Sequence, residues 1–130
     1  MAYMIERKDQ QIVEHILQYC EDIKHTIQRC VNSEHRFSTD RIYRNAGAMA
    51  LLQIGELAKN LSSEFLKEYD QVSWREICRN RDFIAHHYGN FNTTIAWKTM
   101  KNDIPLLEKY CKQVLKENHI RYNKENKIER

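Results

Sequence analysis

The chain has 130 residues, of which 42% are hydrophobic and 30% are charged, and its formal net charge is +3. These values exclude a disordered chain and fit one compact domain of ordinary size, so we expect a single domain over residues 1–130. It contains only 3 Gly and 1 Pro. Because β-rich folds need frequent turn residues, this scarcity favours long helices joined by few loops.

The sequence also lacks the usual features of secreted and membrane proteins. No apolar run approaches the roughly 20 residues that span a bilayer, and Met1–Gln10 is charged where a signal peptide would be apolar. We therefore expect a cytoplasmic protein that does not enter membranes. The cysteines are widely spaced and form no C-x-x-C pair, so we expect buried free thiols without disulfides or a metal site. They are Cys20, Cys30, Cys78 and Cys111.

Apolar residues at helical spacing predict two long helices in the first half of the chain. Over residues 12–31 they recur every three or four positions, which keeps one apolar face through about five turns. After a polar break at 32–39, the same pattern predicts a second helix over 42–61. The side chains that could cap this second helix are Ser38, Thr39 and Asp40.

A loop or short helical turn at 62–71 leads to a third predicted helix. Ser73 and Glu76 form a capping box, in which each side chain satisfies a free backbone amide of the other residue. The helix is predicted to end near Tyr88, because the Gly89 that follows tolerates positive φ.

Two further helices are predicted after this point. Asn92 or Thr93 can cap the fourth helix, and Asp103 can cap the fifth, in whose first turn the missing amide of Pro105 costs little. Short connections between amphipathic helices favour antiparallel neighbours. We therefore predict an all-α, up-and-down bundle of four to five helices.

The end of the chain carries the excess positive charge. Between Lys112 and Arg130 there are six basic and three acidic residues, which account for the net charge of +3. Because Lys and Glu are interleaved, we predict a charged tail over 119–130 that frays from the last helix. A basic surface that attracts nucleic acid is the alternative.

The chemically most versatile residues gather at the end of the third helix. Residues 81–88 match the pattern R-x4-H-x-Y, and here the sequence resembles the HepT ribonuclease toxins of the HEPN superfamily. Segments at 53–59, 74–77 and 102–105 resemble further parts of that family in the same order. The resemblance implies a HEPN-like bundle and a metal-independent endoribonuclease that needs no cofactor. Without the resemblance, a solvated helix end with His near the C-terminal dipole would explain the same residues.

The resemblance makes Arg81 and His86 the catalytic residues. With an ordinary pKa near 6.5, the imidazole of His86 can take the proton of a ribose 2′-hydroxyl or return one to the departing 5′-oxygen. The guanidinium of Arg81 can stabilise the negative charge that gathers on the phosphate. The expected products are a 2′,3′-cyclic phosphate and a 5′-hydroxyl.

Three neighbours are candidate supporting residues. At about 100° per residue, Arg81 and His86 lie about 140° apart on a helix, whereas Arg79 and His86 nearly share a face. Arg79 is therefore a second candidate for the catalytic cation. Asp82 precedes His86 by four residues and could orient its ring or raise its pKa. Glu56 either pairs with an arginine of the third helix or is an exposed helical carboxylate.

The resemblance also implies partners. In the HepT family an MntA-type nucleotidyltransferase antitoxin attaches AMP to the tyrosine that corresponds to Tyr88, and two toxin subunits form a homodimer around a shared RNA cleft. Two alternatives stay open: a non-catalytic HEPN subunit that docks on a nucleotidyltransferase, and a nucleotide-binding bundle without a toxic role. The combination of Arg81, His86 and Tyr88 favours the enzyme, because a docking domain does not need this set.

Overall fold

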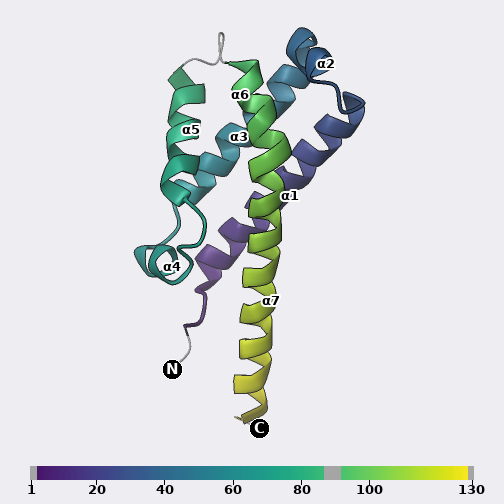
Figure 1. Ribbon diagram of the computed structural model, residues 1–130. Helices are drawn as coiled ribbons and strands as arrows, with labels where there is room; N and C mark the ends of the chain where they lie inside the picture. Colours follow the sequence, from purple (N-terminus) through teal and green to yellow (C-terminus); the bar gives the residue numbers. More distant parts are fainter. Residues whose placement is uncertain (1–2, 87–91, 129–130) are drawn as a thin grey trace.

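The computed structural model describes the backbone of residues 3–86 and 92–128, and their side chains except at 85–86 and 121–128. Every regular element in these ranges is helical, which confirms the all-α prediction (Figure 1). In chain order the elements are α1 (Arg7–Arg29), α2 (Glu34–Thr39), α3 (Arg41–Lys59), α4 (Ser63–Glu68), α5 (Trp74–His86), α6 (Thr93–Lys98), the π-helical segment η2 (Thr99–Asp103) and α7 (Ile104–Ile128).

Helix α3 lies between α1 and α5, and α7 packs along α1. The long helices alternate in direction along the chain, as an up-and-down bundle requires (Figure 1). Fully buried side chains at the centre include Ile16 and Ile23 of α1, Ile54 of α3 and Met100 of η2. Among the described elements, α5 packs mainly against α3. The packing against α3 is therefore the main contact that orients α5.

Short side chains fix the starts of the helices. Asp40 caps α3, because its Oδ1 accepts hydrogen bonds from the amides of Ile42 at 2.8 Å and Tyr43 at 3.3 Å. Ser33 caps α2 within the segment predicted to be a polar break. This helix was missed because six residues are too few to show an apolar period. Ser62 caps α4, which confirms a short helical turn in the predicted connection.

The prediction that Asp103 caps a separate last helix is wrong. Asp103 lies within η2, and Ile104 follows with helical angles of φ −65° and ψ −41°, so α6, η2 and α7 form one continuous helix. Pro105 explains the π-helical turn before it. Proline lacks an amide hydrogen and its ring crowds the carbonyl one turn earlier, and a wider turn accommodates both effects.

Helix α7 continues to Ile128, so the residues predicted to form a tail are helical up to that point. Fraying of this end and the single-domain organisation remain predictions. None of the helices in the described ranges is long and apolar enough to cross a membrane. All four cysteines are free; Cys20, Cys30 and Cys111 are buried as predicted, whereas Cys78 is only half-buried. Burial raises the pKa of Cys20 and of Cys111 to about 12.

Candidate active site

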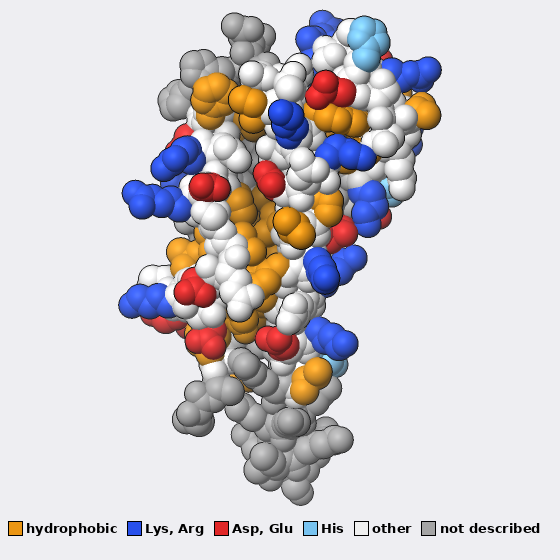
Figure 2. All heavy atoms as spheres, viewed as in Figure 1, with side chains coloured by type: hydrophobic (Ala, Val, Ile, Leu, Met, Phe, Trp, Pro, Cys, Tyr) orange, Lys and Arg blue, Asp and Glu red, His pale blue; other side chains and the backbone are white. Residues whose placement is uncertain are grey.

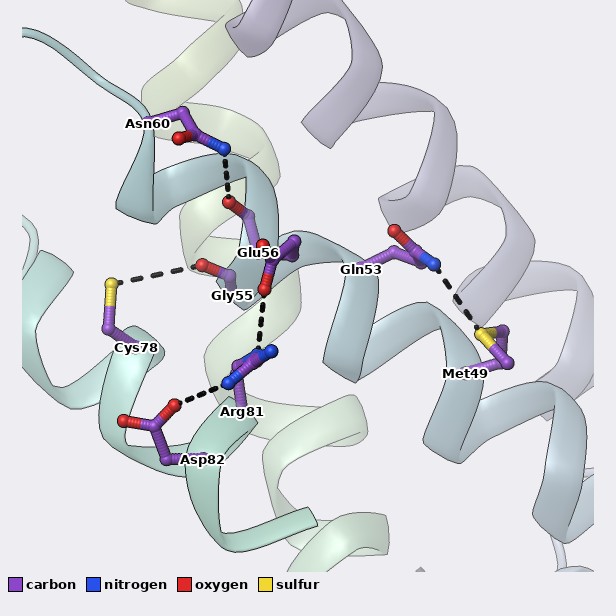
Figure 3. Close-up of polar contacts among 8 residues, drawn as sticks. All are labelled: Met49, Gln53, Gly55, Glu56, Asn60, Cys78, Arg81 and Asp82. Carbon is purple, nitrogen blue, oxygen red and sulfur yellow. Dashed lines mark hydrogen bonds and ion pairs between the residues drawn. The ribbon is translucent and has the colours of Figure 1, made fainter. Parts of the chain in front are cut away.

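Helix α5 comes very close to α3 at Gly55. A methyl group on Gly55 would lie 2.1 Å from Cβ of Arg81 and 3.0 Å from the carbonyl oxygen of Ile77. The thiol of Cys78 donates a hydrogen bond to the carbonyl oxygen of Gly55 at 3.8 Å (Figure 3). The backbone of α3 at this residue is thus in contact with a full turn of α5, a distance that only glycine permits.

The guanidinium of Arg81 lies between two carboxylates, one from each helix (Figure 3). Its Nε is 2.8 Å from Oε2 of Glu56, and its Nη1 is 2.7 Å from Oδ1 of Asp82. The Nε and Oε2 atoms are shielded from solvent, and their contact is an ion pair without the alignment of a hydrogen bond. The side chain of Arg81 therefore extends in a defined direction, from α5 toward α3.

The electrostatics of this cluster keep Arg81 charged. The pKa of Arg81 is raised above its usual value, first because Nη1 donates a hydrogen bond to Asp82 and then because Glu56 adds a nearby negative charge. A side chain that is always cationic can stabilise negative charge on a phosphate over the whole physiological pH range.

The three candidate supporting residues occupy different positions relative to Arg81. Of the two arrangements left open for Glu56, pairing with an arginine of the third predicted helix is observed, and the arginine is Arg81. Asp82 also contacts Arg81. Arg79 is exposed and forms no ion pair with a described carboxylate. Arg81, Glu56 and Asp82 thus form one cluster, and Arg79 stands outside it.

The predicted acid–base and modification residues lie at the edge of the described part. His86 is the last residue of α5, and its side chain lies outside the described residues, as does the whole of Tyr88. Their roles remain predictions.

An apolar groove runs along the side of α5, between this helix and the continuous helix of α6, η2 and α7. Figure 2 shows hydrophobic side chains running down the middle of this face. Phe83 of α5 and Ile95 of α6 are 51% and 57% exposed. The residues that line the upper part of the groove are Leu51, Ile54, Ile77, Asn80, Phe83, Ile84, Asn92, Ile95, Ala96, Thr99 and Ile104.

Sequence reasoning missed two features of this site. It assigned no role to Gly55, although a glycine inside a helix costs about 1 kcal/mol relative to alanine and so indicates a packing requirement. It also missed the groove, because this depends on how α5 and α6 are placed relative to each other.

Comparison with known proteins supports the resemblance to HepT ribonucleases. Residues 16–114 match the family described as Ribonuclease HepT-like. A predicted RNase of Caldanaerobacter subterraneus subsp. tengcongensis is 38% identical over 103 residues, which cover 79% of this chain and 90% of that protein. The probable ribonuclease HepT of Thermococcus cleftensis is 38% identical over 72 residues, which cover 55% of this chain and 66% of the relative.

The name of a longer relative gives a second activity besides that of an RNase. The gamma-glutamylcyclotransferase and predicted RNase of Methanocaldococcus jannaschii is 31% identical over 122 residues, which cover 93% of this chain and 53% of that protein. No solved structure matches the chain significantly. The family match spans most of the bundle and includes the Arg81–Glu56 cluster, and the chain belongs to the HepT-like ribonuclease family.

Proposed function

We propose that the protein is a metal-independent endoribonuclease, the toxin of a cytoplasmic toxin–antitoxin pair, with Arg81 and His86 as its catalytic residues. The observation that carries the proposal is the fixed position of Arg81, held 2.8 Å from Glu56 and five residues before His86 at the end of α5. The family match supports RNA as the substrate.

The reaction follows from the chemistry of the two side chains. The imidazole of His86 accepts the proton of a ribose 2′-hydroxyl, and the 2′-oxygen attacks the adjacent phosphorus. The bond to the 5′-oxygen breaks, and an imidazolium returns a proton to that oxygen. Arg81 donates hydrogen bonds to the non-bridging oxygens while negative charge collects on them. The products are a 2′,3′-cyclic phosphate and a 5′-hydroxyl.

We assign the main cationic role to Arg81 and a lesser one to Arg79. Arg81 gives the R-x4-H-x-Y register, and its guanidinium is already ordered by Glu56 and Asp82. An ordered cation loses little conformational entropy when it binds the phosphate. Arg79 is exposed, so ordering it would oppose binding.

The same proposal includes the partners that the family resemblance implies. Two subunits pair about a two-fold axis that brings the ends of their α5 helices together, which doubles the cationic groups at one RNA cleft. An MntA-like nucleotidyltransferase, acting as the antitoxin, attaches AMP to Tyr88. The added phosphate occupies the anion site beside Arg81 and His86 and repels RNA.

Cleavage of total RNA by the purified protein in the presence of EDTA tests the function. We expect fragments with 2′,3′-cyclic phosphate ends, which resist a 3′-end ligase until the cyclic phosphate is opened and removed. Arg75→Ala, which changes an exposed arginine earlier on α5, is the matched control and should cleave normally. Activity that disappears with EDTA would contradict the metal-free reaction. A protein that cleaves no RNA but binds a nucleotidyltransferase would instead be the docking subunit.

A further inference from the structure

Positions 81 and 86 lie about 140° apart around an ideal helix, which rotates by about 100° per residue. For Arg81 to act on the same phosphate as His86, its guanidinium must therefore be held in a set direction by other side chains. We propose that Gly55 and Glu56 of α3 form a seat that positions the guanidinium of Arg81 for RNA cleavage. This inference rests on the proposed ribonuclease function and assigns positioning residues to it.

Gly55 supplies the space in which the stem of Arg81 lies. A methyl group there would meet Cβ of Arg81 at 2.1 Å, Cγ at 2.9 Å and the carbonyl oxygen of Ile77 at 3.0 Å. Cβ and the carbonyl oxygen are fixed to the backbone of α5 and cannot rotate away. A side chain at Gly55 must therefore push α5 itself away from α3, and the start of the Arg81 side chain moves with it.

Glu56 supplies the charge that sets the direction of the guanidinium. It pairs with Nε, the nitrogen nearest the stem, at 2.8 Å, and both paired atoms are shielded from solvent. Another pair between helices, Lys24 with Glu108, is longer at 3.3 Å, and its side chains are 47% and 14% exposed. Attraction between charges is stronger where water is excluded. The side chains of Arg81 and Glu56 are 26% and 43% exposed, but the two paired atoms are shielded, so this pair holds the guanidinium more firmly than a pair of exposed atoms would.

The seat leaves part of the guanidinium for a substrate. The contacts with Glu56 and Asp82 use Nε and Nη1, and neither uses Nη2. The side chain of Asp82 is 57% exposed, so an incoming phosphate oxygen can replace its carboxylate at Nη1. Glu56 holds Nε through an oxygen that solvent does not reach. Glu56 thus keeps Arg81 oriented while the outer edge of the guanidinium meets the phosphate.

The seat itself is tested without RNA, by the side-chain Nε–H signal of Arg81 in a ¹H–¹⁵N spectrum. Arg81→Lys identifies this signal by removing it. In the unmodified protein it should exchange slowly with water, and in Glu56→Gln and Gly55→Ala it should exchange at least tenfold faster. Gly47→Ala is the matched control, because a methyl group there also meets side chains closely, at 2.7 Å from Phe37, but far from Arg81. Glu68→Gln controls for the loss of an exposed carboxylate.

The role of the seat in catalysis is tested by the rates of the same variants. Glu56→Gln should lower kcat by tenfold or more with little change in KM, and Gly55→Ala by up to about 100-fold, the usual effect of a displacement of about 1 Å. Glu56→Asp, which keeps the charge, should retain more activity than Glu56→Gln. A slowly exchanging Nε–H in Glu56→Gln would overturn the seat, and a normal kcat despite fast exchange would overturn its part in cleavage. If the unmodified protein cleaves no RNA, the proposed function fails with the catalytic part of this inference, and the exchange measurement still decides whether the seat exists.

Discussion

Asp9 of α1 holds the start of α4 through Ser62. Its Oδ1 accepts a hydrogen bond from the amide of Ser62 at 2.9 Å, and its Oδ2 accepts one from the hydroxyl at 2.6 Å. The same hydroxyl caps α4 by accepting from the amide of Phe65 at 3.2 Å. The carboxylate is only 1% exposed. Because α4 connects α3 to α5, this link helps to fix the point at which the helix of the candidate site begins.

Asp9→Ala should therefore lower the free energy of unfolding by about 1–3 kcal/mol, because it leaves the partly buried donors of Ser62 without this partner. Urea unfolding followed by circular dichroism measures the change. Asp22→Ala, an exposed position on the same helix, should have an effect within about 0.5 kcal/mol of zero. Equal stability of the Asp9 and Asp22 variants would contradict the structural role of this link.

Arg81→Ala and His86→Ala should each lower the rate of RNA cleavage by at least about 100-fold, the usual effect of removing a charge-stabilising donor or a general base. Arg79→Ala should lower it less. Initial rates on a defined RNA, with far-ultraviolet circular dichroism to confirm helicity, give the comparison. Full activity of Arg81→Ala together with an inactive Arg79→Ala would show that the cation has been assigned to the wrong residue.

The protein should be a homodimer at micromolar concentration, since one helix end offers only a shallow surface for a phosphate and its neighbouring nucleotides. Size-exclusion chromatography with light scattering gives the mass, to be compared with 15.7 kDa for one chain. Cleavage activity per chain should fall when the protein is diluted below the dissociation constant of the dimer. A fully active monomer would rule out the shared cleft.

Co-expression with the proposed MntA-like nucleotidyltransferase should add AMP to Tyr88 and stop cleavage. Intact mass spectrometry should show one or more additions of AMP, mapped to this tyrosine by peptide sequencing, and Tyr88→Phe should abolish them. A toxin silenced at unmodified mass would mean that the antitoxin inhibits by forming a complex, and that Tyr88 is no modification site.

The buried thiols should make stability fall at high pH. Burial raises the pKa of Cys20 and Cys111 from an ordinary value of 9.0 to about 12. A folded-state pKa above the unfolded value gives stability that is complete below pH 9 and is lost as the pH rises toward 12. Between pH 8 and pH 10.5, the double variant Cys20→Ala, Cys111→Ala should lose less stability than the unmodified protein. Parallel loss in both proteins would assign the decline to other groups.

Features of this structure could be predicted from the sequence where they depend on residues that are close together in the chain. The long helices and the Asp40 cap depend on residues at most four positions apart, and they were predicted correctly. Helix α2 is too short for periodicity. Asp103 is a residue type that often caps helices, but here it lies inside one continuous helix, because packing outweighs this local preference.

The candidate site was predicted in part for the same reason. The register of Arg81 in the R-x4-H-x-Y motif can be read from residues 81–88 alone. Its contact with Gly55 joins residues 26 positions apart, and only the way in which α3 and α5 pack determines it. The sequence left two possibilities for Glu56, an ion pair with an arginine or an exposed carboxylate. A pattern of charges indicates which residues could pair, but it does not give the distance between them.

The contacts of Gly55 and Glu56 with α5 limit substitution at these two positions for different reasons. A methyl group at this position would collide with atoms that almost every residue shares, Cβ at position 81 and the backbone oxygen of Ile77. Relatives that keep the same packing must keep this glycine, whether or not they have an arginine at 81. Glu56 contacts the guanidinium itself. In a relative in which another residue replaces the arginine, the glutamate can therefore be replaced as well. Of two adjacent residues, the glycine thus indicates preserved packing of α3 and α5, and the glutamate indicates a preserved pairing with Arg81.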